Sequence, residues 1–335
     1  MKLQQRLDLL QYLKGYLLQP NDALKAAIDK AYRQNSWFTH EFIYRAANNI
    51  ANHLLDAEKL QEWVSVYSIP EINPHPQTVG ITMAGNIPLV GFHDWLCGFI
   101  SGNRLLIKPS SKDTVLISHL IDTLSRRHSD FAQTVQLADR LNGCSAYIAT
   151  GSNNTSRYFE YYFGRFPHII RKNRTSAAVL TGTETTEELA LLADDMLSYF
   201  GLGCRNVTRL FVPEGYDFRP VLKAFSPYAW MRDHDKLKNN YDYNLSILLL
   251  NNRYYMTEGT VLLVEEETLF SPIAQVNYSF YKPGIAPNLL AEPHLQNLQC
   301  LCGGGLLPFG QAQQPGLCDY ADGVDTLEFM LSLGQ

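Results

Sequence analysis

The stretch TVGITMAGNIPLVGFHDWLCGFISGNRLLIK, residues 78–108, decides the fold class of this chain. It opens with an apolar run at 78–84, typical of a buried strand, and residues 104–107 form a second such run. The intervening residues 88–100 have helical spacing, and Pro88 suits the first turn of a helix. A strand, a helix and a strand in this order predict a βαβ unit, whose two strands are parallel.

The same alternation continues downstream. We expect a helix at 112–127, a strand at 146–150, a helix that opens near Thr155 and a strand at 168–171. This order is typical of a doubly wound, Rossmann-like α/β sheet. A second α/β layer is expected to follow, with strands at 177–180, 207–212 and 259–264 and a helix at 186–199.

The first 66 residues differ from the rest, because their apolar positions recur at helical spacing. We expect three or four amphipathic helices there, with Asn21 and Thr39 as N-caps. No Pro/Gly linker marks a later boundary. The expected division is an N-terminal helical segment (1–66), a Rossmann-like domain (67–172), a second α/β domain (173–310) and a C-terminal segment (311–335).

Composition excludes several classes of protein. The chain has 335 residues, of which 46% are hydrophobic and 18% charged, as in globular proteins. Its 28 basic and 33 acidic residues give a formal charge of -5, which argues against nucleic acid as a partner. We recognise no secretion signal and no apolar stretch near the roughly 20 residues of a membrane span. The six cysteines are therefore expected to be reduced, and the protein to be cytoplasmic.

Cys204 is the candidate nucleophile of the sequence. It lies in YFGLGCRNVTRLFVPEG, between an expected helix and an expected strand, where Gly201 and Gly203 allow the backbone to turn tightly. The neighbouring Arg205 is a cation of the kind that lowers the pKa of a thiol and prepares it to attack an acyl carbonyl. A buried structural cysteine is the alternative, and the local sequence does not decide between the two.

Three further positions are candidate ligand groups. Gly151 and Ser152 follow an expected strand and open a helix, where backbone N–H groups favour phosphate, although an ordinary turn and cap is the alternative. Lys108 ends another strand at the carboxyl edge of the sheet, where ligands gather. Asn86 follows the first strand, and its amide would suit either a developing oxyanion or a helix N-cap.

Cys300 and Cys302, with His294 nearby, raise the question of a metal site. A single C-x-C with one histidine lacks the paired spacing of zinc sites. We therefore expect no metal.

These candidates occur in the order of the aldehyde dehydrogenase superfamily: strand and Asn86, strand and Lys108, strand with Gly151 and Ser152, then a glycine-flanked cysteine. More narrowly, residues 85–113, residues 201–215 and the ending FGQAQQPGLCDYADGVDTLEFMLSL resemble the LuxC-type acyl-CoA reductases. These enzymes supply fatty aldehyde in bacterial luminescence. The resemblance covers about residues 76–335.

The resemblance implies a role for each candidate. Cys204 would carry the acyl group, and Asn86 with the N–H of Cys204 would form the oxyanion hole. Lys108 would bind the adenosine ribose, and Gly151 with Ser152 the pyrophosphate of NADPH or NADH. The backbone at Met83 would pass beside the nicotinamide half of the cofactor. Residues 67–172 would then be the NAD(P)-binding domain and residues 173–310 the catalytic domain.

Two departures from the superfamily pattern are informative. The E-L-G-G motif, whose glutamate activates water to hydrolyse the thioester, has no counterpart in RKNRTSAAVL, residues 171–180. Without that base an acyl-enzyme persists, which favours reduction of a thioester to an aldehyde over oxidation of an aldehyde. In the second departure, Thr268 replaces the glutamate of the E-x-F-G-P stretch that holds the nicotinamide ribose.

The sequence thus predicts an NAD(P)H-dependent reductase of acyl-CoA or acyl-carrier thioesters. An acyl-phosphate reductase of the same superfamily is one alternative. A cysteine acyltransferase or thioesterase without hydride transfer is another, and a non-catalytic interaction subunit is a third. The resemblance adds an acyl-protein synthetase as a candidate partner and leaves a homo-oligomer open.

Overall fold

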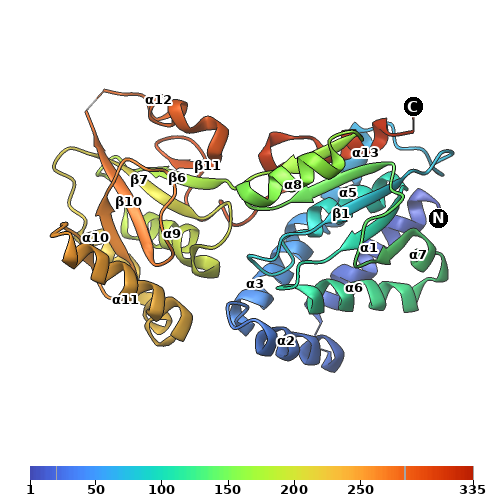
Figure 1. Ribbon diagram of the computed structural model, residues 1–335, viewed down its shortest axis with the longest axis horizontal. Helices are drawn as coiled ribbons and strands as arrows, with labels where there is room; N and C mark the ends of the chain where they lie inside the picture. Colours follow the sequence, from blue (N-terminus) through green and yellow to red (C-terminus); the bar gives the residue numbers. More distant parts are fainter. Residues whose placement is uncertain (20, 283, 335) are drawn as a thin grey trace. The chain divides into compact units, whose positions relative to one another are not determined.

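The computed structural model of the chain describes residues 1–19, 21–282 and 284–334. The chain divides into two compact units (Figure 1). Unit 1 comprises Met1–Asn173 and Pro315–Gln335, and unit 2 comprises Arg174–Gln314.

Unit 1 is built on a five-stranded sheet in which every neighbouring pair is parallel. Its strands, in spatial order, are β3 (Val135–Leu137), β2 (Arg104–Lys108), β1 (Thr78–Thr82), β4 (Ala146–Thr150) and β5 (His168–Arg171). The strand order reverses at β1, as in doubly wound Rossmann-like sheets. The predicted α/β fold class is confirmed.

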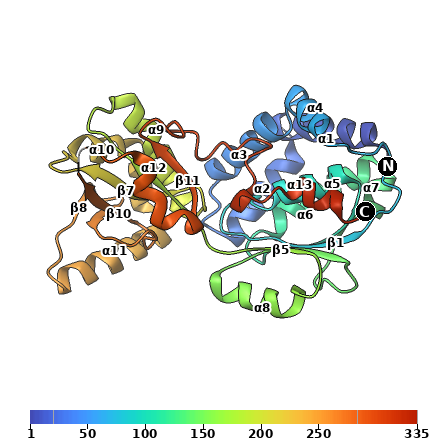
Figure 2. The same ribbon diagram turned by 90° about the horizontal axis from the view of Figure 1, so that it is seen from above.

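Helices cover both faces of this sheet (Figure 2). The crossover helices are α5 (Phe92–Ser101), α6 (Thr114–Arg127), α7 (Ser129–Thr134) and α8 (Asn153–Phe163). Side chains of α5, α6 and α7 share one large core with β1 and β2. In Figure 2, α8 lies on the opposite face, where Phe163 stacks on Tyr147 of β4 with ring centroids 4.1 Å apart.

The predicted N-terminal helices are present, and their apolar faces join the core of the sheet instead of forming one of their own. Asn21 and Thr39 cap their helices through bonds to Leu24 and Phe42, as the sequence predicts. The helical elements are α1 (Leu3–Leu18), α2 (Asp22–Gln34), α3 (His40–Asn49), the π-helix η1 (Ile50–Leu54) and α4 (Ala57–Val66).

The end of the chain returns to unit 1. The helices η5 (Ala321–Gly323) and α13 (Thr326–Ser332) form there, and α13 packs against α5. Arg171 at the end of β5 is buried and forms an ion pair with Asp94 of α5, while its second nitrogen donates to Thr326 Oγ1 at 2.7 Å. Arg171 thus links strand β5 to helices α5 and α13.

Unit 2 contains a six-stranded sheet that is parallel except at one edge. In spatial order its strands are β11 (Leu298–Gly303), β6 (Thr175–Val179), β7 (Val207–Pro213), β10 (Gln275–Tyr281), β9 (Leu262–Glu265) and the antiparallel β8 (Met256–Thr257). Its helices are α9 (Thr186–Leu197), η2 (Ser198–Gly201), α10 (Arg219–Ala224), η3 (Ser226–Asp233), α11 (Asp235–Leu250), α12 (Pro287–Ala291) and η4 (Glu292–Asn297).

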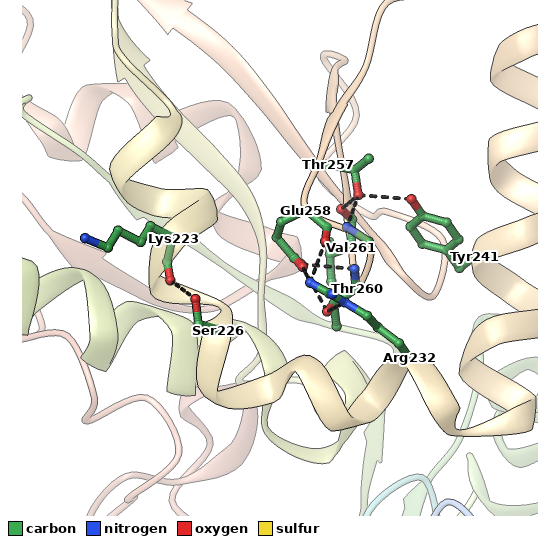
Figure 3. A network of polar contacts seen from close by, with 9 residues as sticks. Lys223, Ser226, Arg232, Tyr241, Thr257, Glu258, Thr260 and Val261 are labelled. Carbon is green, nitrogen blue, oxygen red and sulfur yellow. Dashed lines mark hydrogen bonds and ion pairs between the residues drawn. The ribbon is translucent and has the colours of Figure 1, made fainter.

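The β8–β9 edge is fixed by a polar network (Figure 3). Arg232 of η3 forms an ion pair with Glu258, and its Nε donates to Thr260 Oγ1 at 3.2 Å. Thr257 Oγ1 donates to the carbonyl of Val261 at 2.7 Å, which closes a tight turn. The strand predicted from residue 259 therefore begins only at Leu262.

One expected helix start is wrong. The helix predicted at 88–100 begins at Phe92, because Leu89 has a left-handed φ of 56° and interrupts the helical path. The Leu89 N–H donates to Asp113 Oδ2 at 2.7 Å and holds residues 88–91 in a turn. Among the described residues, no helix is both long and apolar enough to span a membrane.

Candidate active site

The cofactor candidates of unit 1 gather at one edge of its sheet. Because β1, β2 and β4 are parallel, their carboxyl ends share this edge. Met83 follows β1 and is buried, and its N–H donates to the carbonyl of Lys108 at 3.0 Å. The Lys108 side chain is exposed at the end of β2. Gly151 and Ser152 follow β4 at the same edge.

Ser152 is the N-cap of α8. Its Oγ accepts the Thr155 N–H at 3.3 Å and lies 2.9 Å from Thr155 Oγ1. A Cβ on Gly151 would lie 2.9 Å from the ring of Phe159 and 3.0 Å from Thr155 Cβ, so only glycine lets α8 pack this closely on the strand end. The capping alternative is therefore realised, and the hydroxyl remains exposed at the helix terminus.

Asn86 lies on a tightly held loop after β1. A Cβ on the preceding Gly85 would lie 2.5 Å from Ser110 Oγ, so the loops after β1 and β2 approach closely here. Asp113 binds the far end of the same loop through Leu89. Since α5 begins at Phe92 with Gly91 as N-cap, the alternative role of Asn86 as the cap of α5 is excluded.

The loop that carries Cys204 is strongly bent. Tyr199, Phe200 and Gly201 all have positive φ, at 54°, 57° and 72°. The first two are not glycine, so this backbone conformation is unfavourable and must be held by its surroundings. Cys204 follows this turn with a half-buried side chain, and forms no disulfide.

Asn206 holds the turn in place. Its Oδ1 accepts the Gly203 N–H at 2.7 Å, and its Nδ2 donates to the carbonyls of Asp195 and Ser198 at 3.0 and 2.9 Å. The side chain is fully buried. Sequence reasoning missed this residue, although an asparagine between a glycine turn and a strand is a common backbone binder and a usable signal.

The amino ends of β6, β7 and β11 share one edge in unit 2, and the candidate nucleophile lies there. Ser176 of β6 donates from Oγ to the carbonyl of Cys204 at 3.1 Å and lies 3.0 Å from Cys300 Sγ of β11. Arg205 Nη1 donates to the same sulfur at 3.9 Å. A second thiol, that of Cys300, therefore adjoins the Cys204 loop. The sequence pattern had suggested only a metal-binding role for it.

Asp195 of α9 connects this edge to the chain end of unit 2. Its carboxylate accepts the N–H groups of Gly310 and Ala312 at 2.7 and 3.1 Å. Burial raises the pKa of this carboxyl to about 7, despite both hydrogen bonds. Within the described part of the chain, no three His, Cys, Asp or Glu side chains are grouped to hold a metal ion.

Thr268, which replaces the glutamate of the family pattern, is held by hydrogen bonds. Asn277, buried on β10, donates from Nδ2 to the carbonyl and to Oγ1 of Thr268 at 2.9 and 3.0 Å. Thr268 itself is exposed. The preceding Glu267 pairs with the buried Arg209 at 3.1 Å.

A cavity of about 50 Å³ lies against the bent turn before Cys204. Met196, Phe200, Met231 and Ile273 are among its lining residues. The hydroxyl groups in the lining are already bonded, since Thr208 donates to Leu269 and Ser271 to Gln275. The cavity lining therefore combines apolar side chains with hydroxyl groups whose hydrogens are already donated.

Neither the protein-family models nor the curated proteins include a match to this chain. Solved structures do match. Aldehyde dehydrogenase 21 from Physcomitrella patens, in complex with succinate, has a TM-score of 0.63 at 12% identity over 90% of this chain and 74% of its own. The chain has the aldehyde dehydrogenase fold.

Two further solved structures have the same fold as this chain. The indole-3-acetaldehyde dehydrogenase of P. syringae, solved as a mutant with NAD+ and IAA, has a TM-score of 0.62 at 11% identity over 90% of this chain and 70% of its own. The Delta-pyrroline-5-carboxylate dehydrogenase from Mycobacterium tuberculosis has a TM-score of 0.61 at 15% identity, over 96% of this chain and 70% of its own. At these identities the likeness is one of fold.

Proposed function

We propose that the chain is an NAD(P)H-dependent oxidoreductase of the aldehyde dehydrogenase type, which reduces an acyl thioester to an aldehyde through an acyl group on Cys204. The observation that carries the proposal is a half-buried cysteine on a turn that Asn206 and Ser176 hold rigidly, within this fold. Rigid support of this kind is what a nucleophile needs to meet an acyl carbon reproducibly.

In the proposed first step, the Cys204 thiolate attacks the thioester carbonyl and the thiol of CoA or of an acyl carrier leaves. The N–H of Cys204 and the amide of Asn86 are the proposed donors to the oxyanion, by resemblance to the superfamily. The bonds to Asn206 keep the backbone at Gly203 fixed, so the turn needs no reorganisation as charge develops.

The carboxyl edge of unit 1 fits a nicotinamide dinucleotide. The exposed Lys108 ammonium suits the adenosine ribose or a 2'-phosphate, and the exposed Ser152 hydroxyl at the terminus of α8 suits the pyrophosphate. Met83 would contribute backbone beside the nicotinamide half. The P. syringae neighbour was solved with NAD+, which supports the same cofactor class here. When bound, the reduced cofactor supplies hydride to the acyl carbon.

The direction of the reaction rests on the segment 171–180, which contains no acidic residue. Arg171, its first residue, is turned into unit 1 and paired with Asp94. Without a carboxylate in this segment to activate water, the acyl group is expected to stay on Cys204 until it is reduced. An acyl-protein synthetase remains a proposed partner and the cytoplasm a proposed location.

Intact mass spectrometry of the full chain after addition of an acyl-CoA, without cofactor, tests the nucleophile. The wild type should gain one acyl group, and Cys204→Ala should gain none. Cys318→Ala removes an exposed thiol of unit 1 and is the matched control, which should acylate like the wild type. Persistent acylation of Cys204→Ala would overturn the assignment.

A further inference from the structure

Cys300 lies beside several groups that can donate hydrogen bonds. The Ser176 hydroxyl lies 3.0 Å from its Sγ, and Arg205 Nη1 donates to it at 3.9 Å. Cys302 interacts with it as well, which raises the pKa of the Cys302 thiol. A hydroxyl, a guanidinium and a thiol around one half-buried sulfur are groups that stabilise a thiolate.

Cys302 is placed to act as the partner thiol. It lies two residues after Cys300 on β11, and side chains at this spacing point to the same face of a strand. The pairing of β11 with β6 is irregular between Leu298 and Leu301, so Cys300 lies in a distorted part of the strand. The hydrogen bond to Cys300, together with burial, raises the pKa of Cys302, so this thiol keeps its proton.

We propose that Cys300 and Cys302 form a peroxide-reactive thiol site, in which Cys300 is the attacking thiolate and Cys302 the resolving thiol. A half-buried thiolate with cationic and hydroxyl neighbours and an adjacent second thiol is the arrangement that redox-sensitive cysteines use. The site is separate from the acyl chemistry proposed for Cys204.

The chemistry balances with a peroxide as the only oxidant. The Cys300 thiolate attacks one peroxide oxygen, the O–O bond breaks, and hydrogen peroxide yields a sulfenic acid and hydroxide. The Cys302 thiol then attacks the sulfenic sulfur, its proton leaves with the hydroxyl as water, and a Cys300–Cys302 disulfide forms. Overall, two thiols and one hydrogen peroxide give one disulfide and two waters, and a thiol reductant reverses the change.

Ser176 connects this site to the Cys204 loop. Its single hydroxyl hydrogen is donated to the Cys204 carbonyl, while its oxygen accepts the Cys300 N–H at 3.2 Å. When Cys300 is ionised, the same hydrogen can instead turn to the sulfur, and the Cys204 carbonyl then loses that bond. In the Cys300–Cys302 disulfide no thiolate remains to compete for this hydrogen.

The test is peroxide treatment of the reduced full-length protein, read by intact mass and peptide mapping. The wild type should lose two hydrogen atoms, with the link inside the peptide that contains residues 300–302. Cys302→Ser should stop at a sulfenic acid on Cys300, which dimedone captures. Cys300→Ser should show neither product, and the control Cys318→Ser should behave like the wild type.

Dimedone labelling of Cys204 in place of Cys300 in the Cys302→Ser protein would overturn the proposal, as would a disulfide that joins Cys204 to either thiol. A wild type that keeps its thiols under these conditions would do the same. Circular dichroism checks that both serine variants fold, and Cys302→Ala serves as a second variant. None of these readouts uses cofactor or acyl substrate, so the result is independent of the proposed reductase activity.

Discussion

Asn206 holds the backbone of the Cys204 turn through bonds to residues on both sides of it. Asn206→Ala would leave the buried Gly203 N–H and the carbonyls of Asp195 and Ser198 without this partner. We expect the free energy of unfolding to fall by roughly 2–4 kcal/mol, as measured by urea denaturation. Asn251→Ala removes an exposed side-chain bond at the C-cap of α11 and should cost less than about 0.5 kcal/mol. Equal costs would contradict the assigned role.

Asp195 and Asp113 are both buried carboxyls, and they are expected to respond differently to an amide. Asp195 accepts two backbone N–H groups, and an asparagine can accept only one of them while its NH2 opposes the other. Near pH 4, where the raised pKa of this carboxyl no longer lowers stability, Asp195→Asn should therefore cost about 2–3 kcal/mol in the free energy of unfolding. Asp113→Asn keeps an acceptor for Leu89 and is the matched control, expected to match the wild type at the same pH. An Asp195→Asn protein as stable as Asp113→Asn would show that the two N–H bonds contribute little.

Burial raises the pKa of Asp113 to about 7, which fixes the sign of a pH effect. An acid whose pKa is raised in the folded state binds a proton that the unfolded chain has already released. Stability is therefore lost as pH rises from about 4 to about 7. Asp113→Asn should match the wild type near pH 4 and exceed it by about 1–3 kcal/mol near pH 8. Urea denaturation at both pH values measures this, and an unchanged difference between them would contradict it.

The residues that decide these effects could not be predicted individually. The turn at Cys204 can be predicted from the sequence, because the glycines that allow it are adjacent to the cysteine along the chain. The partners of Asn206 and Asp195 lie on other elements, as the Gly310 and Ala312 bonds show, and local patterns carry no information about them. The contact between Cys300 and Ser176 is of the same kind, since the two residues are on different strands.

At the scale of elements, most of unit 1 could be predicted from hydrophobic periodicity and from the turn and cap residues that bound each element. Strand β4 was predicted with its observed bounds, and β5 likewise, because each is a short apolar run bounded by turns. The predicted start of α5 was wrong because Pro88 suits the first turn of a helix, whereas the left-handed Leu89, whose N–H is bonded to Asp113, interrupts the helical path. Strands β3, β8, β10 and β11 were missed, since none of them has a clear helix on both sides as a guide.

The fit of α8 against β4 gives a prediction for this element. Gly151→Ala places a methyl group within 3.0 Å of Phe159 and Thr155, so the start of α8 must move. If this terminus binds the pyrophosphate, the dissociation constant for NAD(P)H should rise by roughly tenfold, a loss of about 1.4 kcal/mol. Cofactor fluorescence measures it. Gly15→Ala on α1 has open space and is the control, expected to leave binding unchanged.

At the scale of the whole molecule, the alternation of strands and helices was enough to predict an α/β fold, and the observed fold is that of the aldehyde dehydrogenases. The sequence did not reveal that the N-terminal helices share the core of the first sheet. Amphipathic spacing indicates that one face of a helix is buried, but it does not identify the element that covers this face. The proposed direction of the reaction depends on the lack of an acidic residue in segment 171–180. The structure adds that Arg171, the first residue of this segment, is paired with Asp94.

The most direct test of the account measures cofactor and aldehyde together. Purified protein is mixed with NADPH or NADH and acyl-CoA thioesters of graded chain length, and aldehyde is trapped as it forms. We predict that each cofactor oxidised yields one aldehyde, and that Cys204→Ala yields none. Repeated release of CoA with no cofactor oxidised would instead indicate an acyltransferase or thioesterase, and cofactor oxidation without aldehyde would contradict the central claim.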